Sequence, residues 1–238
     1  MEFDGSGFSG WQAQPGLRTV QTELERAIKS LTGEELRVVG AGRTDAGVHA
    51  LGQVVSFKTE SRHEPEVFRR GLNALLGEDA AVLSAEEAPP DFDAQRSAVG
   101  KWYRYLIRES RNKVALERDR VWRLGYALEL EAMRAGALHL IGEHDFSSFR
   151  SSTCDTKTSV RRMKRIEIFR NGQGRLVFEF WAGGFLKQMA RTMVGTLVEV
   201  GRGKLRPEEI KSILEARDRT RAGPTAPAQG LYLARVDY

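Results

Sequence analysis

The stretch that decides the fold of the second half of the chain is residues 159–181, SVRRMKRIEIFRNGQGRLVFEFW. Residues 159–169 and 175–181 are rich in β-branched and aromatic side chains, which favour strands. Between them lies Asn171-Gly172-Gln173-Gly174, a group of residue types that form tight turns readily. The stretch therefore predicts two antiparallel strands joined by a short turn.

Helices and further strands are expected on both sides of this hairpin. Upstream, residues 99–108 alternate as a strand, and apolar residues between positions 130 and 141 recur at helical spacing. Downstream, residues 185–197 predict a helix, Pro207 begins another, and residues 230–236 predict a closing strand. With the helix at Pro207 as an addition, the second half has the order β-α-β-β-α-β, which is that of a ferredoxin-like unit.

The first half has the same order. A strand ends near Phe3, Thr19 is a suitable N-cap for a helix, and Pro65 begins a second helix. Further strands are expected at residues 36–39, 53–57 and 80–83, and Pro89-Pro90 then interrupts the chain. We expect an α+β protein of two ferredoxin-like halves, residues 1–92 and 93–238, forming one extended mixed or antiparallel sheet with the helices on one face.

Composition excludes several classes of protein. Hydrophobic residues make up 41% of the 238 residues and charged residues 29%, which is typical of a globular chain. No run approaches the ~20 apolar residues of a membrane span, and the single cysteine, Cys154, excludes an internal disulfide and favours a cytoplasmic location. The net charge of +5 favours a polyanion such as nucleic acid, although it also serves general solubility.

The densest cluster of potentially catalytic residues is GAGRTDAGVH at positions 40–49. It places one carboxylate, Asp45, two residues from one arginine, Arg43. A neighbouring guanidinium stabilises the ionised, nucleophilic form of a carboxylate, so the pair suits covalent catalysis. The alternative is an ion pair in a surface loop, which would contribute under ~1 kcal/mol to stability.

Metal and nucleotide chemistry find no support in the sequence. The four histidines are scattered, and no spacing typical of zinc ligands occurs. There is neither a phosphate loop ending in Gly-Lys-Ser/Thr nor a Gly-x-Ser-x-Gly elbow. We therefore expect no metal site and no cofactor.

Basic and aromatic residues are interleaved in two places, a composition found in RNA-binding surfaces. Lys101-Trp102-Tyr103-Arg104-Tyr105 lies on a predicted strand, and residues 157–165 (KTSVRRMKR) carry five basic side chains. The alternatives are a half-buried strand and a solvated basic face. Further on, Lys187 and Arg191 are four residues apart, so they are expected to share a helix face that points away from the apolar one.

The sequence resembles the bacterial tRNA pseudouridine synthases that modify positions 38 to 40 of the anticodon stem-loop. The segments that carry the resemblance extend along essentially the whole chain: Phe3-Asp4-Gly5 to Gly10-Trp11-Gln12, GAGRTDAGVHA at 40–50, Tyr103-Arg104-Tyr105, Gly142-Glu143-His144-Asp145-Phe146, FLKQMARTMVG at 185–195, and Ala228-Gln229-Gly230-Leu231-Tyr232-Leu233. The GRTDAGVHA part of the segment at 40–50 is highly specific to this family.

The resemblance implies roles for individual residues. Asp45 matches the catalytic aspartate, Arg43 the arginine of its motif, and Arg191 the arginine that pairs with that aspartate. Tyr103 matches the tyrosine that stacks on the target base and Leu231 an apolar residue of the pocket. Lys187 is expected to contact the substrate because of its positive charge. The first half would carry the catalytic loop, and the second would complete the RNA cleft of a homodimer that uses no cofactor.

Two other functions are alternatives to this interpretation, and the sequence departs from the family at one point. A non-catalytic RNA-binding protein would not depend on Asp45, and a nucleoside hydrolase would release free uracil. Only three residues precede Asp4, whereas relatives usually have a fuller first strand, so the edge of the first sheet is expected to be less stable.

Overall fold

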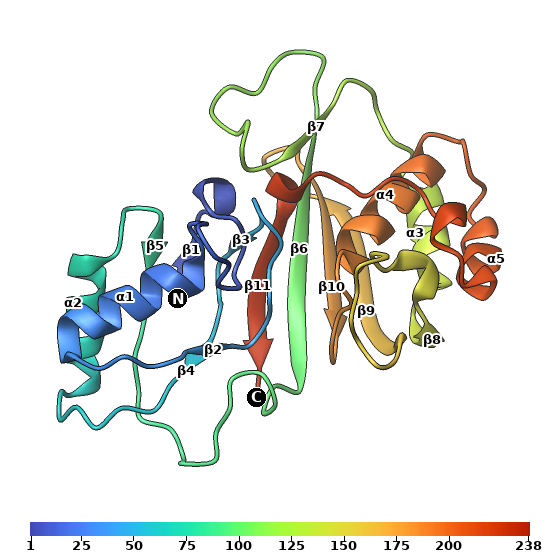
Figure 1. Cartoon of the computed structure of the whole chain (residues 1–238). Coiled ribbons are helices and arrows are strands. Elements are labelled where there is room, and N and C mark those ends of the chain that lie inside the picture. The colour runs from blue at the N-terminus through green and yellow to red at the C-terminus, as the bar shows by residue number, and fades with distance from the viewer. The chain divides into compact units, whose positions relative to one another are not determined.

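The computed structural model describes all 238 residues, which form two compact units (Figure 1). One unit comprises Met1–Val99 together with Tyr232–Tyr238, and the other comprises Gly100–Leu231. Strands and five α-helices are both present, so the prediction of an α+β protein is confirmed. The last strand, β11 (Leu231–Asp237), follows the second half in sequence, yet nearly all of it belongs to the first unit.

The first unit contains a four-stranded mixed sheet in the order β5-β1-β3-β11. Here β1 (Glu2–Phe3) is antiparallel to both β5 (Ala80–Ala81) and β3 (His49–Ala50), whereas β11 is parallel to β3. Thus β1 lies between two strands and is not at the edge of the sheet. The strands predicted at 36–39 and 53–57 are reduced to β2 (Val39–Gly40) and β4 (Val55–Ser56), which form a separate pair.

The two helices of the first unit begin where the sequence predicts. α1 (Val20–Thr32) starts with a capping box, in which Thr19 Oγ1 accepts from the Thr22 N–H at 3.3 Å and Thr22 Oγ1 accepts from the Thr19 N–H at 3.2 Å. It ends at Gly33, whose φ of 80° is accessible mainly to glycine. α2 (Pro65–Leu75) has proline in its first turn and packs against α1.

The second unit is built on the strand order β6-β10-β9-β8, and β7 (Trp122–Leu124) lies parallel to the other edge of β6. The predicted hairpin is confirmed: β9 (Val160–Arg170) and β10 (Leu176–Ala182) are antiparallel, and Asn171 Oδ1 accepts from two N–H groups within the turn. β10 also pairs with β6 (Gly100–Glu109). The short strands β7 and β8 (Gly142–Asp145) were not predicted.

Three helices complete the second unit: α3 (Leu130–Leu138), α4 (Met189–Gly201) and α5 (Glu209–Ala216). All residues of α4 except Arg191 and Glu199 are buried, as expected of a helix that is apolar on every side. α4 begins four residues later than predicted, because Gln188 has a φ of 63° and so cannot continue a helix from Phe185.

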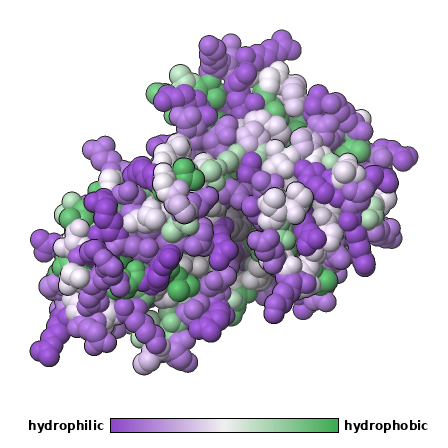
Figure 2. Space-filling model, in the orientation of Figure 1, coloured by the Kyte–Doolittle hydropathy of each residue, from purple (hydrophilic) through white to green (hydrophobic).

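The two faces of the second unit's sheet differ in burial. Tyr103, Tyr105 and Ile107 of β6 are buried on the face that packs against α4. On the opposite face, Trp102 and Trp181 are half-buried and stack at 5.6 Å between ring centroids. Hydrophilic residues dominate the surface that is visible in Figure 2. No helix is long and apolar enough to span a membrane.

Candidate active site

The loop that carries Asp45 connects β2 to β3 in the first unit, and a buried amide holds its beginning. Gln53 Nε2 donates to the Gly42 carbonyl at 2.7 Å, and Gln53 Oε1 accepts from the Gly42 N–H at 3.3 Å. The Gln53 side chain is fully buried, so these two bonds are shielded from water. The backbone directly before Arg43 is therefore fixed.

A second chain segment supports the middle of this loop. The Trp11 N–H donates to the Thr44 carbonyl at 3.1 Å. Gly10 adopts a φ of 90°, and a Cβ at this position would lie 2.7 Å from the same carbonyl oxygen. Only glycine permits this close approach of two backbones. The GSGFSGW region at 5–11 and the Asp45 loop thus form one structural element.

The loop is buried on either side of the Asp45 turn. Thr44 and Val48 are buried, whereas Asp45 is half-buried and Arg43 is exposed. The Val48 N–H donates to the Asp45 carbonyl at 3.1 Å, which closes a turn after Asp45. The side chain at position 45 is therefore accessible while its backbone is held, as a positioned carboxylate requires.

His49 anchors the end of the loop, a role that the sequence analysis missed. Its Nδ1 accepts from the Gly5 N–H at 3.0 Å, and its ring stacks on Tyr232 with 4.7 Å between centroids. His49 is 2% exposed. One feature of the sequence indicates this role, namely that His49 ends the GRTDAGVH motif.

We expect that Gln53→Leu loosens the Asp45 loop. The leucine is of similar size but leaves the buried Gly42 N–H and carbonyl without partners, which should lower the free energy of unfolding by about 1–3 kcal/mol. Urea denaturation measures this loss, and Gln173→Leu in the exposed hairpin turn is the matched control. An unfolding free energy equal to that of the control would mean that Gln53 does not hold the loop.

Tyr103 and Leu231 lie in the second unit and are both buried, 7% and 5% exposed. The Tyr103 ring meets Phe185 edge to face, with 4.7 Å between centroids. Leu231 follows a single 3-10 turn, Ala228–Gly230, that Tyr105 helps to fix by donating from its hydroxyl to the Pro227 carbonyl at 2.7 Å. Phe185 is a neighbour of Tyr103 that the sequence analysis did not identify as a site residue.

Arg191 lies in the first turn of α4, and its surroundings correct the expectation of a polar helix face. The helix has no such face, and Arg191 is half-buried. Its Nε donates to the Ala226 carbonyl at 2.8 Å, and the Ala226 N–H donates back to the Arg191 carbonyl at 3.1 Å. The Nε bond orients the guanidinium and the backbone bond fixes the two chain segments beside it, unlike the situation of a solvated surface arginine.

Lys187 does not share a helix face with Arg191, contrary to expectation. It precedes α4, separated from it by Gln188 with its positive φ, and its Nζ donates to Thr153 Oγ1 at 2.9 Å. Arg43 and Asp45 thus lie on one loop of the first unit, while Tyr103, Lys187, Arg191 and Leu231 belong to the second.

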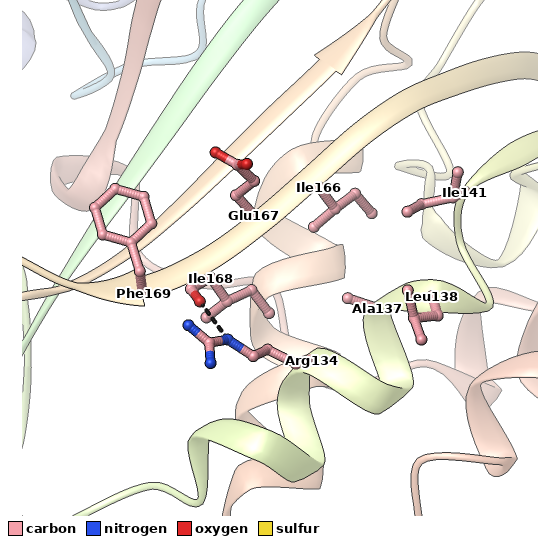
Figure 3. A pocket seen from close by; sticks show the side chains of 8 residues that line it. All are labelled: Arg134, Ala137, Leu138, Ile141, Ile166, Glu167, Ile168 and Phe169. Atoms are coloured by element: carbon pink, nitrogen blue, oxygen red, sulfur yellow. Dashed lines mark hydrogen bonds between the residues drawn. The ribbon is translucent and has the colours of Figure 1, made fainter.

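A cavity of about 410 Å³ lies elsewhere in the second unit, between α3 and β9 (Figure 3). Mostly apolar side chains line it, and Arg134 Nε donates to the Ile168 carbonyl at 2.8 Å beside it. None of the predicted site residues contributes to its lining. The side chains form no group of three or more His, Cys, Asp or Glu that could hold a metal ion.

This chain is similar to known proteins that are named as tRNA pseudouridine synthases. The model of the family described as tRNA pseudouridine synthase matches residues 1–95 and 137–238. Proteins named tRNA pseudouridine synthase A are similar over the full chain: that of Acetivibrio thermocellus is 47% identical, with 97% of its length covered. That of Geotalea uraniireducens is 43% identical with 97% covered, and that of Nitrosomonas europaea 45% identical with 87% covered. The chain belongs to the tRNA pseudouridine synthase family.

Proposed function

We propose that this protein isomerises uridine to pseudouridine at positions 38, 39 and 40 of the tRNA anticodon stem-loop, with Asp45 as the catalytic residue. One observation supports the proposal above all: the chain belongs to the pseudouridine synthase family and has an ordered loop that presents the Asp45 carboxylate. Buried Gln53 and the Gly10–Trp11 backbone hold this loop, and Asp45 remains accessible. A homodimer is part of the proposal, on the strength of the family resemblance.

The reaction exchanges one bond to the sugar for another. The C1′–N1 bond breaks, the uracil turns, a C1′–C5 bond forms, C5 loses its proton and N1 gains one. Asp45 can assist by attacking C1′, by adding to C6 of the ring, or by removing a sugar proton to give a glycal. Each route requires an ionised carboxylate, which the charges of Arg43 and Arg191 would favour.

The remaining residues are assigned to the substrate. The detached uracil must be held while it turns, and an aromatic surface suits this purpose, so Tyr103 is proposed to stack on the base, with Phe185 packed against its ring. Leu231 would contribute an apolar wall and Lys187 a contact with the RNA backbone. The target uridine must leave the stem, which costs a few kcal/mol that backbone contacts have to offset.

Product analysis tests the proposed function. An anticodon stem-loop labelled with ³²P on the 5′ side of the target uridine is incubated with the protein, digested to nucleotides and separated by thin-layer chromatography. We expect the label to move from the uridine to the pseudouridine position. Unchanged uridine would indicate a protein that only binds RNA, and a loss of base with release of free uracil would indicate a hydrolase.

A further inference from the structure

Two basic side chains lie on the same sheet face as Tyr103, at the end of the second unit's strands. Lys101 precedes Tyr103 by two residues in β6, so both point to the same side. Lys101 pairs with Ala182, and Ala182 pairs with Met163. Arg161 is two residues from Met163 in β9, which places it on this side as well.

Neither side chain has an acidic partner. The Lys101 side chain makes no hydrogen bond and no ion pair, although it is half-buried. Arg161 donates only to backbone carbonyls, those of Thr158 at 3.0 Å and Val160 at 2.7 Å. On the opposite face of the same sheet, by contrast, Arg104 pairs with Glu179 at 2.6 Å, and Arg165 pairs with Glu167.

The two cations lie in an unfavourable electrostatic environment. Burial lowers the pKa of the Lys101 ammonium, and the positive charge of Arg161 lowers it further. Burial also lowers the pKa of Arg161, and Cys154 offsets part of that effect. Two partly desolvated cations without a carboxylate partner destabilise the free protein, and a bound anion would remove that cost. The arrangement is therefore better suited to holding an anion than to stabilising the fold.

We propose that Lys101 and Arg161 bind the backbone phosphodiester adjacent to the target uridine. This inference rests on the proposed function, in which Tyr103 stacks on the base. Two residues along a strand span roughly 7 Å, comparable to the span from a nucleobase to its own backbone phosphate. A phosphate held beside Lys101 would keep the extruded nucleotide in register while its base turns on Tyr103. The four other basic side chains of the 157–165 run do not share this position, since they are all exposed: Lys157, Arg162, Lys164 and Arg165.

The inference is tested by removing the charge of the protein side chain and the charge of the RNA phosphate in separate experiments. Lys101→Met should weaken binding of an anticodon stem-loop about tenfold and lower the log–log salt slope by about 0.7–0.9, the value for one phosphate contact. Lys211→Met, an exposed lysine of α5, is the matched control and should change neither quantity. In the RNA, a neutral methylphosphonate replaces the single phosphodiester on the 5′ or the 3′ side of the target uridine.

The two changes should not be additive. One of the two methylphosphonates should weaken binding to the unaltered protein about tenfold but cause little further loss in Lys101→Met. If both methylphosphonates weaken binding to Lys101→Met as much as to the unaltered protein, or if Lys101→Met binds normally, the proposed contact is wrong. A failure of the proposed function is distinguishable, because the unaltered protein would then form no pseudouridine at all.

Thermal unfolding separates this role from a structural one. Lys101 has no partner in the free protein and is repelled by Arg161, so Lys101→Met should unfold at the same temperature as the unaltered protein or a higher one. A marked fall in the unfolding temperature, together with additive effects of the methylphosphonate, would assign Lys101 to packing and overturn the proposal.

Discussion

Replacing Asp45 with asparagine should abolish pseudouridine formation while leaving the affinity for tRNA within about tenfold of the unaltered protein, because phosphate contacts dominate RNA binding. Asparagine has nearly the shape of aspartate, and Gln53 and Trp11 hold the loop backbone through bonds that do not involve the Asp45 side chain. The loop should therefore keep its conformation. What is lost is the ionised carboxylate that every route to pseudouridine requires, as a nucleophile in two of them and as a base in the glycal route.

Single-turnover product formation and filter binding measure the two quantities with the same RNA. Asp91→Asn removes an exposed carboxylate from the same unit and should leave both unchanged. Substantial turnover by Asp45→Asn would rule out Asp45 as the catalytic carboxylate. A loss of binding as large as the loss of turnover would instead mean that the loop had been disrupted.

If Arg191 is a charge partner of Asp45, as proposed, Arg191→Ala should reduce turnover by at least ~100-fold, the size of effect that follows the loss of one preorganised charge. Without that charge the Asp45 carboxylate is less favoured in its ionised form, so the acidic limb of the pH–rate profile should move to higher pH. Arg191→Lys should restore only part of the activity, since an ammonium does not replace a planar, two-pronged guanidinium. Single-turnover rates between about pH 5 and pH 9 provide the profile.

The pH profile is needed because Arg191 also has a structural contact. Its Nε bonds to the Ala226 carbonyl, so its removal could act by releasing that segment. A structural defect would lower the free energy of unfolding without moving the acidic limb. Arg202→Ala, at the C-terminal end of the same helix and ion-paired with Glu199 at 2.9 Å, is the control and should retain normal turnover. Normal turnover by Arg191→Ala would remove Arg191 from the proposed site.

The elements that could be predicted from the sequence are those with a strong local signal. Thr19 at the start of α1 and the Asn171–Gly174 turn between β9 and β10 act through contacts within a few residues, and both are confirmed. The strands β3, β7 and β8 are two to four residues long. Such short segments show no periodicity, and partners distant in the sequence stabilise them, so they were missed.

Errors at the candidate site have similar causes. Phe185 and Met189 are four residues apart, which suggested one continuous helix, but the positive φ of Gln188 leaves no trace in the pattern of apolar residues. For this reason Lys187 was wrongly placed on the helix, whereas it precedes α4. Gln53 and His49 hold the Asp45 loop through buried hydrogen bonds to residues 11 and 44 positions away, a long-range relation that spacing does not reveal.

The most direct test of the central claim is tritium release from anticodon stem-loops that carry [5-³H]uridine at one position only. Forming the C1′–C5 bond expels the hydrogen of C5, so each isomerisation releases one tritium to water. We expect tritium release from labels at positions 38, 39 and 40, no release from a uridine elsewhere in the stem-loop, and no free uracil. Full retention of tritium at all three positions, or its appearance in free uracil, would contradict the central claim.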